Sequence, residues 1–231
     1  MVSGLGIGVS ATSLLKHGMA VDIVEIDPMV YAYARKYFGL PEPRHAFLED
    51  GRAVVTRAAN DTYDYILHDV FTGGSVPKRL FSLEFIREIR RVLKPDGVLT
   101  LNFVGSMDGS DAMAMFSIWR TLLEVFPQVA IFKEAPRASS GVINMVFMAS
   151  TLPIEFRPFE EADYLDGDMR YHAFQQLEAS RVDMPDKEQW LQRADIVTDE
   201  HNRLDQWQQT AALQHWQTMR DLLPLSFWLN Y

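Results

Sequence analysis

The stretch Ser3-Gly4-Leu5-Gly6-Ile7-Gly8-Val9-Ser10 decides how the rest of this chain is interpreted. Three glycines on alternate positions let a backbone turn tightly and approach a ligand with no side chains in the way. The next apolar run, residues 21–28, ends in acidic residues and places Glu25 at the tip of a second strand. A carboxylate there can accept hydrogen bonds from ribose hydroxyls, so the sequence predicts a nucleoside site in a βαβ unit.

The spacing of the glycines favours one kind of nucleoside. The dinucleotide fingerprint is G-x-G-x-x-G, whereas here the third glycine, Gly8, comes one residue early and Val9 occupies the dinucleotide position. No G-x-x-x-x-G-K-[ST] phosphate loop occurs in the sequence. We therefore expect a nucleoside without a pyrophosphate, of which S-adenosylmethionine is the common example. A dinucleotide and a purely structural turn are the two alternatives.

Composition and charge exclude several kinds of site and partner. The 231 residues are 48% hydrophobic and 23% charged, as in ordinary globular proteins, and the net charge of −9 disfavours nucleic acid and anionic membranes as main partners. No cysteine is present, and the histidines show no metal-ligand spacing, so we expect no metal. Because no apolar run reaches membrane-spanning length and no signal peptide is apparent, we expect a cytoplasmic protein.

Strand and helix patterns alternate through the first 150 residues. Predicted strands cover residues 21–26, 45–48, 63–69, 98–103, 129–133 and 143–149. Predicted helices run from Ser10 or Thr12 to His17, from Pro28 with Asp27 as its N-cap to about Phe38, and over residues 51–59, 82–93 and 111–125. Only three residues precede the glycine loop, so we expect either an unusually short first strand or a chain cut from a longer protein.

This alternation predicts an α/β fold with a doubly wound, mostly parallel sheet. The last two strands, joined by Ser139-Ser140-Gly141, are expected to close the sheet as an antiparallel edge hairpin. We divide the chain into a nucleoside-binding core, residues 1–150, and a C-terminal helical extension, residues 151–231. In the extension, residues 204–223 are predicted to form one helix that packs on the core. Alternatively, the aromatic terminus (Phe227, Trp228, Tyr231) forms a homodimer interface.

Several segments occur in the order seen in spermidine/spermine synthases, and the chain resembles that family and the wider class of spermidine-synthase-like methyltransferases. Among these proteins it looks most similar to fungal spermidine-synthase-like proteins. The segments are Gly4-Leu5-Gly6-Ile7-Gly8, Val24-Glu25-Ile26-Asp27-Pro28, Glu49-Asp50-Gly51-Arg52, Tyr63-Asp64-Tyr65-Ile66-Leu67-His68-Asp69, Leu93-Lys94-Pro95-Asp96-Gly97 and Val197-Thr198-Asp199.

The resemblance implies a Rossmann-like methyltransferase fold with seven strands in the order 3-2-1-4-5-7-6. It also implies which residues contact S-adenosylmethionine or its decarboxylated form. Gly4, Gly6 and Gly8 would lie at the aminoacyl or aminopropyl arm, Glu25 at the ribose, and Asp50 with Gly51 at the adenine. Asp69 matches the family aspartate that orients the attacking amine or accepts its proton.

Two positions depart from the polyamine-synthase pattern. Those enzymes carry an aspartate inside the glycine motif, where this chain has Ile7. Their fourth strand is followed by Asp-x-x-Asp-Pro, and here Thr72 stands in place of the second aspartate. A cationic polyamine needs several fixed carboxylates to offset its desolvation, so these departures disfavour polyamine synthesis.

The chemistry required of the protein is modest. An adenosyl sulfonium already carries an activated leaving group, so the protein has to position the nucleophile and remove one proton. Asp69, at the carboxyl end of the fourth strand, is our catalytic candidate, with a loop-capping aspartate as the alternative. Thr72 and Asn102 are candidates for the acceptor pocket. Strand alternation points His68 to the opposite face from Asp69, which favours a structural histidine.

Three functional hypotheses follow from these residues. The first is a sulfonium-dependent transferase that methylates a small-molecule acceptor, with aminopropyl transfer of polyamine synthesis as the alternative. The second is a repurposed relative, either a cofactor-independent cyclase or a non-catalytic dimerisation module. The third, a nicotinamide dehydrogenase, is disfavoured by the glycine spacing.

Overall fold

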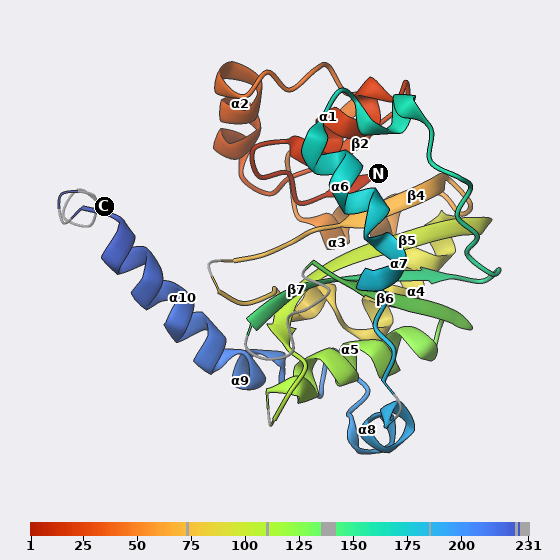
Figure 1. The fold of residues 1–231 in the computed structure, drawn as a ribbon, viewed down its shortest axis with the longest axis vertical. Coiled ribbons are helices and arrows are strands. Elements are labelled where there is room, and N and C mark those ends of the chain that lie inside the picture. Colours follow the sequence, from red (N-terminus) through yellow and green to blue (C-terminus); the bar gives the residue numbers. More distant parts are fainter. Residues whose placement is uncertain (73, 110, 135–141, 185, 225, 227–231) are drawn as a thin grey trace.

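The structure is a computed structural model, and it describes residues 1–72, 74–109, 111–134, 142–184, 186–224 and 226. Its strands form one sheet in the order β3-β2-β1-β4-β5-β7-β6, which confirms the predicted fold class (Figure 1). Strands β1 to β5 run parallel, and β7 is antiparallel to both β5 and β6. The strands are β1 Val2–Ser3, β2 Asp22–Val24, β3 His45–Phe47, β4 Tyr63–His68, β5 Leu93–Ser106, β6 Gln128–Lys133 and β7 Val142–Ser150.

Helices lie on both faces of the sheet and bury two apolar clusters. The smaller cluster lies under helices α1 (Val9–Lys16) and α2 (Pro28–Tyr37) and contains Ile23 of β2. The larger one lies under α3 (Gly51–Arg57), α4 (Leu83–Val92) and α5 (Ala112–Leu123). Neighbouring strand residues alternate between the two clusters, as successive side chains of a strand must.

The first strand has two residues, and a short first strand was one of the two alternatives that the sequence leaves open. Val2 and Ser3 are buried and pair with β2 on one side and β4 on the other. The helix after the glycine loop begins earlier than predicted, because Gly8 rather than Ser10 or Thr12 is its N-cap. Gly8 has a φ of +87°, a left-handed conformation that suits glycine, and no side chain caps the helix.

The other predicted helix starts are confirmed. The side chain of Asp27 accepts a hydrogen bond from Met29 N, and Pro28 occupies the first turn. Asp50 caps α3, and Ser82 caps α4 by accepting from Phe85 N. These caps satisfy amide groups that have no partner within the helix. They therefore fix where three helices begin at the edge of the sheet.

The chain after β7 forms short helical pieces, which are η2 (Glu161–Tyr164), α6 (Asp168–Gln175), α7 (Leu177–Ser180), α8 (Lys187–Arg193) and α9 (Leu204–Trp207). Arg170 of α6 donates to Ser13 Oγ at 2.6 Å, which ties α6 to α1. Trp190 of α8 stacks on Phe116 of α5, with 4.9 Å between ring centroids. The extension is thus fastened to both faces of the core as far as α9.

The last helix differs from the prediction of one helix packed on the core. Leu204 is buried in α9, but the helix is interrupted at Gln208, and α10 (Gln209–Leu222) projects away from the body (Figure 1). The buried Gln208 side chain accepts from Val76 N and donates to Val104 O, which fixes the interruption. The aromatic residues at 227, 228 and 231 lie outside the described residues. Within the described ranges, no helix is both long and apolar enough to span a bilayer.

Candidate functional site

A cavity of about 1110 Å³ opens at the carboxyl ends of β1, β2 and β4. This is the edge at which open α/β sheets bind ligands. Its walls come from the glycine loop, the ends of β2 and β3, the start of α3, and the segment between β4 and α4. The predicted site residues that line it are Gly4, Gly6, Glu25, Asp50, Gly51, Asp69 and Thr72.

The glycine loop is held against the end of β4 by a very close approach. Gly4 N donates to Val24 O at 2.9 Å, and Gly4 has a φ of +85°. A Cβ atom at Gly4 would lie 2.0 Å from Asp69 O, so no other residue fits there. Gly6 faces open space within the cavity wall. Gly8 does not line the cavity; it packs against Leu40 and begins α1.

Glu25 is buried at the cavity wall, and both of its oxygens are already hydrogen-bonded. Oε2 accepts from Leu5 N and Oε1 from Asp27 N, each at 2.9 Å. The carboxylate therefore joins the glycine loop to the start of α2. Because each carboxylate oxygen can accept two hydrogen bonds, one lone pair on each is left for a pair of vicinal hydroxyls.

Asp50 combines the two roles that its position allows. Its Oδ1 accepts from Arg52 N at 2.8 Å and from Ala53 N at 3.2 Å, as an N-cap does. The same residue lines the cavity next to Gly51, whose added Cβ would lie 3.3 Å from Ser3 Oγ. Gly51 thus allows α3 to start close to β1. Capping leaves Oδ2 of Asp50 available to a ligand in the cavity.

The structure brings together two predicted residues of neighbouring strands. Asp69 directly follows β4, whereas Asn102 lies within β5, which continues to Ser106 instead of ending at residue 103 as predicted. Asn102 Nδ2 of β5 donates to Asp69 Oδ1 at 2.8 Å, and Asp69 N donates to Ser3 O at 2.8 Å. The pairing of His68 with Leu101 in the two parallel strands places the following residues side by side. Thr72 lies further along the loop, where its hydroxyl donates to Ser75 O at 3.2 Å. Asp69 is therefore oriented by Asn102, whereas Thr72 shapes the loop.

His68 lies on the opposite face of the sheet from Asp69, as strand alternation predicts. It is fully buried between Phe81 and Phe85, and its Nε2 lies 3.0 Å from Leu80 O. That contact requires a proton on Nε2, so Nδ1 is the unprotonated nitrogen; among the described residues it has no hydrogen-bond partner. Burial lowers the pKa of His68 to about 4, and the ring is neutral at physiological pH.

We expect His68 to make the fold sensitive to acid. The unfolded chain takes up a proton at this residue below about pH 6.5, whereas the folded chain does so only near pH 4, so stability falls across that interval. The loss from this residue is about 2 kcal/mol between about pH 7.5 and pH 5. Urea denaturation of the wild type and of His68→Gln at both pH values measures it. An equal loss in both proteins would contradict this assignment.

A clamp beside the cavity was missed by sequence reasoning. Arg52 makes a bidentate ion pair with Asp199, and Arg52 Nη1 also donates to Arg79 O at 2.9 Å. Ser82 Oγ donates to Asp199 at 2.6 Å. The Arg52 guanidinium holds the pKa of the Asp199 carboxyl below its usual range. Both residues belong to segments that carry the family resemblance. They are 147 residues apart, so no spacing rule could have suggested that they form a pair.

We expect Asp199→Asn to loosen this wall of the cavity. The pair is about three-quarters buried, so its loss should destabilise the fold by about 1–2 kcal/mol, between the values for surface and buried pairs. Because Arg52 lines the cavity, adenosyl ligands should also bind several-fold more weakly. Thermal denaturation and calorimetry measure the two effects, with Glu42→Gln as the control, since its pair with Arg35 is far more exposed. Equal effects of the two substitutions would argue against the clamp.

The cavity suits an adenosyl ligand by shape and by chemistry. An open glycine backbone faces one side, and acceptor oxygens of Glu25 and Asp50 face another. Asp69 lines the cavity next to the glycine loop, where a reacting group on the ligand arm would meet an acceptor. In the part of the chain that the structure describes, no group of three or more histidine, aspartate or glutamate side chains is placed to hold a metal ion.

Comparison with known proteins identifies a family model and relatives that this chain resembles. Residues 1–155 match the family model described as the spermine/spermidine synthase domain. The N-terminal histidine N-methyltransferase of Emericella nidulans is 38% identical over 99% of this chain, and the chain covers 43% of it. The polyamine aminopropyltransferase of Vibrio vulnificus is 30% identical over 87% of this chain, and the chain covers 66% of it. This chain therefore spans less than two thirds of the length of either relative.

Solved structures agree on the fold. A probable spermidine synthase from Corynebacterium glutamicum superposes with a TM-score of 0.66 at 22% identity, over 86% of this chain and 71% of the other. Human methyltransferase-like protein 13 in complex with SAH superposes with a TM-score of 0.54 at 23% identity, over 80% and 83% of the two chains. Identities this low carry the fold and nothing more.

Proposed function

The chain belongs to the spermine/spermidine synthase domain family, and from this premise we propose that it is an S-adenosylmethionine-dependent methyltransferase that acts on a nitrogen atom. The observation that carries the proposal is which carboxylates surround the cavity. Glu25, Asp50 and Asp69 line it, as a nucleoside and an attacking amine require. Glu49 also lines it, but its charge is offset by an ion pair with Arg57. The two further carboxylates typical of polyamine synthases are replaced by Ile7 and Thr72. A site with fewer fixed negative charges suits an acceptor less cationic than a polyamine.

The acceptor we propose is a nitrogen of an N-terminal histidine residue on a polypeptide. The support is the activity for which the Emericella relative is named, since that relative aligns with nearly the whole of this chain. The sequence alone predicts a small-molecule acceptor. A terminal histidine offers the same chemistry at the reacting end, because its amine and imidazole nitrogens are small nucleophiles.

In the proposed reaction the lone pair of the acceptor nitrogen forms a bond to the methyl carbon. The carbon–sulfur bond breaks, its electron pair stays on sulfur, and the nitrogen loses one proton. S-adenosylmethionine, when bound, supplies the activated methyl group. Asp69 holds the acceptor: its Oδ1 is engaged by Asn102, so Oδ2 is the oxygen that accepts an N–H of the acceptor and then its proton.

A second candidate is aminopropyl transfer, which the Vibrio relative's name favours. The two reactions use different donors, and only S-adenosylmethionine has an α-carboxylate to place. Calorimetry with S-adenosylmethionine and with its decarboxylated form therefore separates them. We expect tighter binding of S-adenosylmethionine, followed by a mass gain of one methyl group on a peptide that begins with histidine. Preference for the decarboxylated donor and an aminopropyl gain on a diamine would reverse this proposal.

A further inference from the structure

We infer that helix α10 is a docking arm for the polypeptide acceptor, and that its face formed by Ala212, His215, Met219 and Leu222 binds the chain that follows the methylated residue. This inference rests on the proposed function, because it assumes that the reacting nitrogen belongs to a polypeptide. The first observations concern the base of α10, where the helix contacts the loop that follows Asp69. We call these four residues the arm stripe.

The base of α10 is bonded directly to the loop that follows Asp69. Gln208, immediately before the helix, accepts from Val76 N at 3.1 Å. One turn later, Ala212 lies against Gly74: a Cβ added at Gly74 would come 2.7 Å from Ala212 Cα. A glycine is therefore required where the loop meets the helix.

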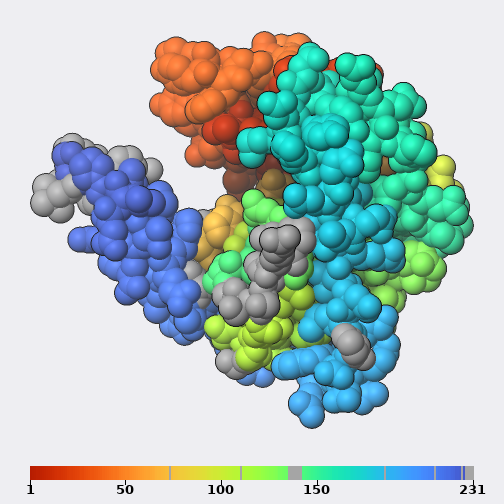
Figure 2. All heavy atoms as spheres, viewed as in Figure 1, coloured from red at the N-terminus to blue at the C-terminus, as the bar shows by residue number. Residues whose placement is uncertain are grey.

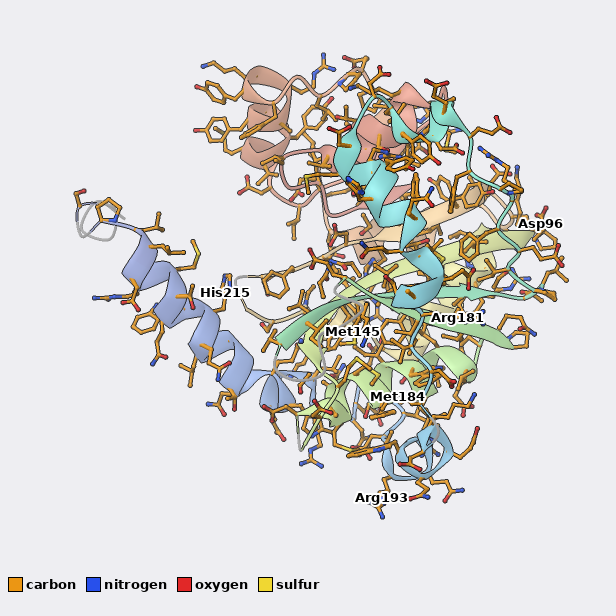
Figure 3. The ribbon with its side chains drawn as sticks, in the orientation of Figure 1. Asp96, Met145, Arg181, Met184, Arg193 and His215 are labelled. Carbon is orange, nitrogen blue, oxygen red and sulfur yellow. The ribbon has the colours of Figure 1, made fainter. Side chains whose placement is uncertain are left out.

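An aromatic contact connects a residue of the cavity wall to helix α10. The rings of Phe71 and His215 meet edge to face, with centroids 5.9 Å apart and planes at 88°. Phe71 lines the cavity, only two residues after Asp69. Figure 3 shows His215 on the side of α10 that faces this loop. His215 is therefore the point at which the cavity and the arm are continuous.

The arm stripe continues outward from this contact. Residues at i, i+3, i+7 and i+10 share one helix face, so Met219 and Leu222 follow His215 along the side that faces the body. Leu222 is 72% exposed, which leaves a large apolar side chain without cover. The space-filling view shows a hollow between α10 and α2, open to solvent (Figure 2). A chain that lies in this hollow would cover the stripe.

The length of α10 favours a polypeptide as the occupant. The 14 residues of α10 reach about 21 Å from the base, far beyond what a histidine or a diamine can contact. An extended peptide advances about 3.3–3.6 Å per residue, so about six residues match the helix. Met219 and Leu222 lie about 6 Å and about 10 Å beyond His215 along the helix, so about two and three peptide residues separate them from that contact.

The test compares a long and a short acceptor. The long probe is an octapeptide with an N-terminal histidine and leucines at its fourth and sixth residues, and the short probe is histidine amide. The measured quantity is the ratio of kcat/KM for the octapeptide to kcat/KM for the amide. We expect this ratio to fall about tenfold in Met219→Ala/Leu222→Ala, which corresponds to about 1.4 kcal/mol. It should stay unchanged in Leu213→Ala, because Leu213 is exposed on the opposite face of the same helix.

A binding measurement separates this inference from the proposed function. Fluorescence anisotropy of the labelled octapeptide, with the protein saturated by S-adenosylhomocysteine, reports docking even if no methyl group is transferred. Weaker binding to Met219→Ala/Leu222→Ala than to Leu213→Ala supports the arm, whatever the reaction proves to be. Equal binding to both variants, an unchanged kcat/KM ratio, or a dimer that only the double variant dissolves would overturn it.

Discussion

Asp69→Asn should lower kcat for the proposed methyl transfer about 100-fold or more, with the affinity for S-adenosylmethionine unchanged. An amide keeps the size of the side chain but cannot accept the proton that the acceptor nitrogen loses. The amide oxygen of the new side chain can still accept from Asn102 Nδ2, so the substitution keeps the hydrogen bond that orients the group and puts an NH2 group in place of Oδ2. Single-turnover kinetics together with calorimetry measure the two quantities separately.

The matched control is Asp64→Asn, on the same strand but at its other end. Asp64 pairs with Lys94 at the surface and touches no part of the cavity. We expect its kcat to equal that of the wild type. If Asp69→Asn retained full kcat, the residue would be only a cap for the loop that follows β4, and the catalytic assignment would be withdrawn. If it abolished S-adenosylmethionine binding instead, its role would be structural.

Gly4→Ala should damage both stability and binding more than any other single methyl group added to the core. The new Cβ would lie 2.0 Å from Asp69 O, so the loop or the end of β4 has to move. The φ of +85° adds the cost of a left-handed conformation, about 1–2 kcal/mol. We expect a loss of about 3 kcal/mol or more in the free energy of unfolding, and no detectable S-adenosylmethionine binding. Chemical denaturation and calorimetry provide the measurements.

Gly18→Ala separates the two causes. Gly18 has a similar φ of +75°, but a Cβ there would meet nothing within 4 Å. It should therefore cost only the backbone term, about 1–2 kcal/mol, and leave ligand binding intact. Equal losses from both substitutions would mean that the contact with Asp69 O contributes nothing.

Much of the fold was predictable because the caps and the alternation are local signals. Asp27, Asp50 and Ser82 start helices where the sequence predicts, and each does so through its own neighbours. The predicted N-cap of α1 was wrong, because Gly8 begins this helix without a hydrogen bond from any side chain. The interruption at Gln208 was hidden because it depends on Val76 and Val104, both more than 100 residues away.

In the candidate site, too, one contact was predictable from the sequence and another was not. The sheet order that the resemblance implies makes the strands of Asp69 and Asn102 neighbours. Their contact also depends on the register that pairs His68 with Leu101, because Asn102 lies within β5 and not at its end. Arg52 and Asp199 are 147 residues apart, and no pattern in either segment indicates a partner. Packing on the tertiary scale, rather than spacing along the chain, decides such pairs. The assigned roles stay predictions until the substitutions are measured.

The donor pocket and the projecting α10 are built from separate parts of the chain. The donor pocket is built almost wholly before residue 80, whereas the outlying helix contributes 14 residues near the end of the chain. On our inference that α10 docks the acceptor, substitutions confined to this helix would change which polypeptides are methylated and leave the donor pocket unchanged. Exchanging α10 with that of a relative would then offer a direct way to change the acceptor in the laboratory.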